Sequence, residues 1–136
     1  MDFKLRNGEQ VRTVLATKES ATVIEAGDIV DFDGSGYIAK ADASSSAIAY
    51  APKGAAAGVT DVEVTVGNDF ELVGTAAHVF AITYKGAEVD LVMSGSDQLI
   101  DVDASSTDVF KVAIDKNAGT VASTASVVVK INKPLF

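Results

Sequence analysis

The sequence predicts an all-β protein, a single-domain sandwich or small barrel of about ten short strands with an extended N-terminal arm. Apolar residues alternate with polar ones over short runs, and turns containing Gly, Asn or Asp recur at roughly 8–12-residue intervals. No stretch has the spacing of an amphipathic helix, because serines, glycines and Pro52 interrupt the alanine-rich segments. At most, a short helical turn is expected at 42–48 or 103–108, where Asp and Ser can cap it.

The composition indicates one globular domain with its own core. The chain has 136 residues, of which 48% are hydrophobic, and contains six Phe, three Tyr and no Trp. It has no Cys, which excludes disulfides and thiolate zinc sites. It also lacks an apolar run of the roughly 18 residues that a membrane span needs, and its first residues lack the apolar core of a secretory signal. We therefore expect neither a membrane partner nor Sec-type export.

Charge is distributed unevenly along the chain, whose net charge is −8. Residues 21–110 carry fifteen acidic residues and three lysines, whereas residues 111–136 carry four lysines and one aspartate. An acidic body disfavours binding to nucleic-acid phosphates, which requires a basic patch. The simplest interpretation is a solvated acidic surface that maintains solubility. The alternative is that the basic ends contact an acidic partner, such as another copy of the same chain.

The first ten residues form the predicted arm, and residues 11–136 form the predicted domain. Phe3 and Leu5 alternate with Lys4 and Arg6, a pattern that suits a strand added to the sheet edge of a neighbour. A frayed terminus and packing against its own domain are the alternatives.

The expected strands follow from the alternation and from the turns between them. Residues 28–32 form a strand that turns at 33–36 and returns over 37–40. Further strands are expected where Val62, Val64 and Val66 alternate with polar residues, and where Phe110, Val112 and Ile114 do. The turns at 67–69, 85–86, 94–96 and 116–119 separate strands, and the first two are expected to close hairpins joining 62–66 to 70–73 and 79–84 to 87–92.

The stretch D-F-D-G-S-G-Y-I-A-K-A-D, residues 31–42, has nearly the ligand spacing of a calcium loop. Its candidate ligands are Asp31, Asp33, Ser35 and Asp42. An EF-hand also needs a helix on each side, and the flanking residues are β-branched or rich in Ala and Ser. We therefore interpret the stretch as a hairpin turn and keep the metal site as the minor alternative.

Other candidate sites are weaker. The cluster Asp101, Asp103 and Asp108 has a serine where a calcium loop needs glycine. The single histidine, His78, has no cysteine to pair with, and no G-x-S-x-G motif is present. The segment G-A-A-A-G at 54–58 lacks the lysine of a phosphate-binding loop. We expect no enzymatic activity and no cofactor.

The segment E-A-G-D-I-V-D-F-D-G-S-G-Y-I-A-K-A, residues 25–41, followed by a Gly/Ala-rich connection and a V-x-V strand, resembles the small all-β decoration (cement) proteins of tailed-phage capsids. The resemblance spans roughly residues 10–75. It implies a structural protein on the outer capsid surface of a virion, made in the host cytoplasm, that bridges subunits of the major capsid protein and commonly forms a homotrimer.

On this interpretation, Phe3 and Leu5 anchor the arm on a partner while Lys4, Arg6 and Arg12 face an acidic surface. Removing residues 1–8 should then weaken capsid binding without unfolding the body. The alternative function is a ligand-binding module, carbohydrate-binding or adhesive, stabilised by calcium at residues 31–42. It would present Tyr37, Tyr50 or Tyr84 to a sugar.

Overall fold

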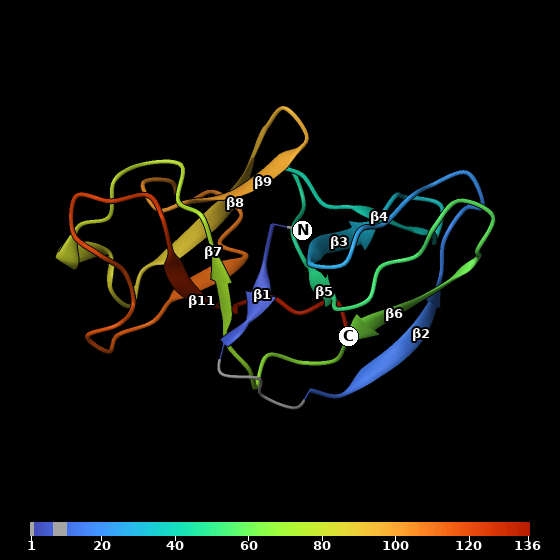
Figure 1. Ribbon diagram of the computed structural model, residues 1–136, viewed down its shortest axis with the longest axis horizontal. Coiled ribbons are helices and arrows are strands. Elements are labelled where there is room, and N and C mark those ends of the chain that lie inside the picture. Colours follow the sequence, from blue (N-terminus) through green and yellow to red (C-terminus); the bar gives the residue numbers. More distant parts are fainter. Residues whose placement is uncertain (1, 7–10) are drawn as a thin grey trace.

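The computed structural model describes residues 2–6 and 11–136, and in this part of the chain the protein is all-β (Figure 1). The described residues form eleven strands in three antiparallel sheets and one 3-10 turn, η2 (Ile82–Tyr84). The strands are β1 (Lys4–Leu5), β2 (Thr13–Thr17), β3 (Asp28–Phe32), β4 (Ile38–Lys40), β5 (Ala49–Ala51), β6 (Asp61–Thr65), β7 (Leu72–Gly74), β8 (Glu88–Ser94), β9 (Asp97–Asp101), β10 (Phe110–Val112) and β11 (Val127–Ile131). The predicted fold class is confirmed.

The sheets form three layers with two cores between them. The large sheet has the order β1-β7-β11-β10-β8-β9, the middle sheet the order β4-β3-β5, and β2 and β6 form a two-stranded ribbon. β3 is buried on both faces: Ile29 enters the core against the large sheet, and its neighbour Val30 enters the smaller core against the ribbon. Two-sided burial therefore explains why two consecutive residues of this strand, Ile29 and Val30, are both apolar and fully buried.

The large core is the main source of stability. The inner face of the large sheet contributes Leu72, Leu91, Phe110 and Val129, all fully buried. Phe3 stacks on Phe110 with ring centroids 5.4 Å apart. Burial of this much apolar surface is the dominant favourable term in folding.

The described part of the predicted arm, residues 2–6, is a strand of its own chain's large sheet. Lys4 and Leu5 pair with Val73 and Leu72 of β7, and Phe3 is only 4% exposed. Gly74 makes room for this ring, since a Cβ there would lie 2.4 Å from Phe3 Cε2. The buried Phe3 therefore cannot serve as an anchor on a partner, because exposing it would open the core. Residues 1 and 7–10 of the predicted arm lie outside the described residues.

Two predicted turns close hairpins and two do not. β3 pairs with β4 around the turn at 33–36, as predicted, and β8 pairs with β9 around Gly95-Ser96. The hairpin predicted at 67–69 is wrong, because β6 pairs with β2 in the ribbon whereas β7 joins the large sheet. The hairpin predicted at 85–86 is also wrong, because the residues before it form η2. The sequence shows the turns but not which core each flanking strand fills.

The structure also corrects the weak helical expectations. Residues 42–48 and 103–108 form turns and no helix. In the second segment the backbone instead wraps around the carboxylate of Asp90, which accepts hydrogen bonds from the N–H groups of Ser106, Thr107 and Asp108 at 2.9 Å. The carboxylate satisfies the backbone donors that a helical turn would have left free.

Candidate binding face on the large sheet

A row of charged side chains crosses the outer face of the large sheet. Lys111 on β10 lies opposite Lys130 on β11 and, on its other side, opposite Glu88 on β8. Continuing the β7–β11 register places Glu71 beside Lys130, and Arg6 donates its backbone N–H to the Glu71 carbonyl at 3.1 Å. The row exists because every second residue of these strands points away from the core.

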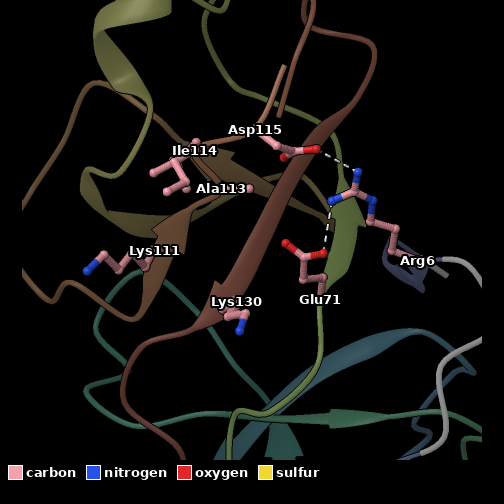
Figure 2. Close-up of a pocket in the computed structure, with 8 residues that line it drawn as sticks. Arg6, Glu71, Lys111, Ala113, Ile114, Asp115 and Lys130 are labelled. Carbon is pink, nitrogen blue, oxygen red and sulfur yellow. Dashed lines mark hydrogen bonds and ion pairs between the residues drawn. The ribbon is translucent and has the colours of Figure 1, made fainter. Parts of the chain in front are cut away.

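At one end of the row, Arg6 joins three segments of the chain (Figure 2). Its Nη1 donates to Glu71 Oε1 and its Nη2 to Asp115 Oδ2, each at 2.9 Å. The Asp115 hydrogen bond is the main cause of the raised Arg6 pKa, and the same contact lowers the pKa of Asp115. Arg6 thereby holds the connection after β10 against the edge formed by β1 and β7. Arg6 therefore has a structural role, because both ends of its guanidinium already bind carboxylates of its own chain. We call Arg6, Glu71 and Asp115 the Arg6 clasp.

In the middle of the row, Lys111 and Lys130 face one another directly. Neither forms an ion pair with any described residue. Like charges that are directly opposite on antiparallel strands destabilise a sheet. Each lysine also has a glutamate on its other side, Glu88 next to Lys111 and Glu71 next to Lys130, so positive charge is concentrated only in the middle of the row.

A shallow hollow of about 620 Å³ lies between this lysine pair and the Arg6 clasp. Val112, Ala113 and Ile114 form its apolar part. Figure 2 shows Ile114 beside the hollow, next to Ala113, and its side chain is 77% exposed. The sequence places Ile114 in a half-buried strand, but β10 ends at Val112, so this residue is released to solvent. We call Lys111, Ala113, Ile114 and Lys130 the lysine face.

The acidic loop at 31–42 is built as a turn. Asp33 Oδ1 accepts hydrogen bonds from the backbone N–H of Ser35 at 2.8 Å and of Tyr37 at 3.3 Å. Asp42 Oδ1 accepts from the N–H and hydroxyl of Ser44, and the hydroxyl contact is the main cause of its lowered pKa. Within residues 2–6 and 11–136, no three acidic or histidine side chains are placed to hold one metal ion. The hairpin interpretation accounts for these carboxylates without a cation.

The remaining sequence candidates do not form a reaction centre. His78 Nε2 lies 3.3 Å from Asp101 Oδ1, and the histidine is more than half exposed. Among the described residues no serine hydroxyl contacts His78, so the Ser–His pair of a hydrolase is not assembled there.

Asp90 is a buried carboxylate that the sequence analysis missed. Burial opposes its ionisation, but the N–H groups of Asp108, Ser106 and Thr107 together hold its pKa below the ordinary value. The signal in the sequence was an aspartate at an apolar position of a strand, followed at a distance by a Ser/Thr-rich loop. Its role is to fasten that loop to β8.

Comparisons of the chain with protein-family models, with curated proteins and with solved structures each return no match. In the described residues, no helix is long and apolar enough to cross a bilayer.

Proposed function

We propose that this protein is a non-enzymatic structural protein that binds the outside of a phage capsid and stabilises it by bridging subunits of the major capsid protein. The observation that carries the proposal is the lysine face: two directly opposed lysines, neither in an ion pair with a described residue, beside an apolar hollow and an exposed isoleucine. Two like charges side by side next to exposed apolar groups form a surface that an acidic partner can neutralise.

The chemistry of the face defines the partner surface. Two ammonium groups on neighbouring strands attract carboxylates, and Ala113 and Ile114 offer apolar contact next to them. Exposed apolar patches that are rimmed by charge are typical of protein interaction sites. We therefore propose that an acidic segment of the coat protein, with an apolar residue beside its carboxylates, covers the lysine face.

We propose a capsid as the partner because residues 25–41 resemble the decoration proteins of phage capsids. The two cores and the short, well-paired strands suit this role, because a rigid body loses little conformational entropy when it binds. Under the proposal the protein is located on the outer surface of the virion.

The ligand-binding alternative has less support. The three tyrosines of the chain do not form a flat surface on which a sugar could stack. Tyr50 is buried, and Tyr84 packs edge-on against Phe80. The hollow on the large sheet is lined by no aromatic side chain. Carbohydrate sites stack sugars on aromatic rings, so the lysine face suits a protein partner better.

The test is binding to undecorated shells of the phage that encodes the chain. The variant Lys111→Gln/Lys130→Gln removes both charges of the face, and Lys53→Gln/Lys133→Gln removes two exposed lysines elsewhere. We expect co-sedimentation with shells to fall at least tenfold for the first variant and less than twofold for the second. Wild-type protein that fails to sediment with the shells would refute the capsid role, and equal loss in both variants would refute the assignment of the face.

A further inference from the structure

One edge of the two-stranded ribbon is open to a further strand. The two residues that flank β2 hydrogen-bond the residues that flank β6. Arg12 O accepts from Val66 N at 2.9 Å, and Lys18 N donates to Thr60 O at 2.8 Å. Hydrogen bonds in an antiparallel pair involve every second residue. The backbone groups of Thr13, Leu15 and Thr17 therefore point away from β6.

Nothing in the described part of the chain caps this edge. β2 is the terminal strand of its sheet and lies at the rim of the molecule (Figure 1). No described group hydrogen-bonds the outward N–H or C=O of Thr13, Leu15 or Thr17. Proteins usually protect such an edge with charge, proline or a bulge. The five residues T-V-L-A-T contain no charge and no proline, and they pair with β6 without interruption.

The side chains along this edge are uncharged and include an exposed leucine, as is common in protein interfaces. Leu15 is 72% exposed, with a threonine two residues away on each side. Its cross-strand neighbour Glu63 is already held by the Thr13 hydroxyl at 2.6 Å and by Lys53 at 3.1 Å. The carboxylate directly across from Leu15 thus has partners within its own chain and does not need a charged group on an incoming strand.

The order of residues in β2 identifies the occupant. Reversed about Leu15, T-V-L-A-T places threonine opposite threonine, a small aliphatic residue opposite another, and leucine opposite leucine. We propose that β2 pairs antiparallel with β2 of a second copy, about a two-fold axis at Leu15, to form a continuous four-stranded sheet. The outward groups of Thr13, Leu15 and Thr17 then form hydrogen-bonded pairs with Thr17, Leu15 and Thr13 of the second copy.

This dimer goes beyond the proposed function and does not depend on it. Its two-fold symmetry differs from the three-fold assembly that the resemblance implies, so a mass measurement separates the two. The edge of β2 belongs to the ribbon, whereas the lysine face belongs to the large sheet. A dimer joined at β2 would therefore leave both lysine faces available to coat subunits.

The first experiment is light scattering across a concentration series. Wild-type protein should approach twice its 14.0 kDa chain mass. Leu15→Pro removes an N–H that β6 does not use, and proline is tolerated on edge strands, so the ribbon should remain intact while the dimer dissociation constant rises at least 100-fold. Leu15→Thr keeps the N–H but loses the apolar contact, and a rise of about tenfold is expected. A wild-type monomer at millimolar concentration, or a trimer that Leu15→Pro does not alter, would overturn the proposal.

A cysteine cross-link tests the geometry independently of affinity. The chain has no cysteine, so Leu15→Cys introduces a single thiol. Residues in a hydrogen-bonded antiparallel pair have Cα and Cβ atoms about 5.5 Å apart, which is long for a disulfide but within reach of a short bismaleimide linker. Leu15→Cys should therefore be cross-linked into a covalent dimer by that reagent, and Val23→Cys, exposed in the connection between β2 and β3, should not. Equal cross-linking of both variants would indicate random collision and would refute the pairing. Loss of shell binding with an intact dimer would count against the capsid role alone.

Discussion

The side-chain amide of Gln98 hydrogen-bonds both backbone groups of Ile29. Gln98 Oε1 accepts from Ile29 N at 2.9 Å, and its Nε2 donates to Ile29 O at 2.7 Å and to Ala41 O at 3.0 Å. Gln98 is on β9 of the large sheet and Ile29 on β3 of the middle sheet, so one buried side chain joins the two layers.

Replacing Gln98 should destabilise the protein. Gln98→Leu leaves the Ile29 N–H without its partner inside the core, and a buried unsatisfied group costs about 1–3 kcal/mol. We expect the free energy of unfolding in urea at pH 7 to fall by about 3 kcal/mol, because two carbonyls lose their donor as well. Asp97→Asn, next to it on an exposed position, is the control and should change stability by less than about 0.5 kcal/mol. A similar small effect for Gln98→Leu would show that the layers are held by packing alone.

Phe3 is expected to be essential to the fold rather than to a partner. Phe3→Ala removes a ring that stacks on Phe110 in the large core, and such truncations cost about 3–5 kcal/mol. The sequence alone led us to expect that removal of residues 1–8 would leave the body folded. The structure predicts that this deletion and Phe3→Ala both lower the melting temperature strongly. Lys4→Ala, next to Phe3 and exposed on β1, should leave the melting temperature nearly unchanged, and a stable deletion variant would contradict this assignment.

Asp90 should make stability depend on pH in the acid range. Its pKa is lowered in the folded state, so its contribution is complete at neutral pH and is lost as the pH falls through the folded-state value. Asp90→Asn should lower the free energy of unfolding at pH 7 by about 2 kcal/mol, since hydrogen bonds to a charged group are worth about 1.5–3 kcal/mol. The difference from wild type should shrink below about pH 4, the ordinary value of an aspartate. Urea titrations from pH 7 to pH 2.5 measure it, and a difference independent of pH would exclude this role of the carboxylate.

The lysine face predicts a substitution that does not destabilise the free protein. Lys130→Gln removes the repulsion from Lys111 and also the attraction to Glu71 on the neighbouring strand, and because the two effects are of similar size we expect the free energy of unfolding to change by less than about 0.5 kcal/mol. Salt screens both effects, so the difference from wild type should be smaller still in high salt, and a loss above about 1 kcal/mol would show that Lys130 supports the fold. Thermal melts at low salt and in about 1 M salt, where the screening length is about 3 Å, provide the comparison. Lys53→Gln, which loses an exposed ion pair with Glu63, should not stabilise.

Calcium should not affect stability. Asp33 uses one carboxylate oxygen for the N–H groups of Ser35 and Tyr37, and Asp42 is engaged by Ser44. We expect identical melting temperatures with millimolar calcium and with chelator. A rise of several degrees with calcium would restore residues 31–42 as a metal site and favour the ligand-binding alternative.

The hairpin at 28–40 was predictable because all of its determinants are local. The β-branched and aromatic residues of 28–32 and 37–40 favour strands, and Gly34 and Gly36 between them adopt φ values of 91° and 90°, which glycine accepts without strain. The lysine face was not predictable in the same way. Lys111 and Lys130 are far apart in the sequence, and only the β10–β11 register brings them together.

By itself, the sequence determined the all-β class, the position of the turns and the absence of thiol chemistry, because each depends on periodicity or composition. The tertiary structure alone decided that β6 and β7 enter different layers, that Phe3 enters its own core, and that Gln98 joins two sheets. The physical reason is that strand pairing is non-local: a half-buried strand has the same alternation whichever neighbour it meets. Only packing of the two cores selects the partner of each strand, and with it the charges and edges that remain on the surface.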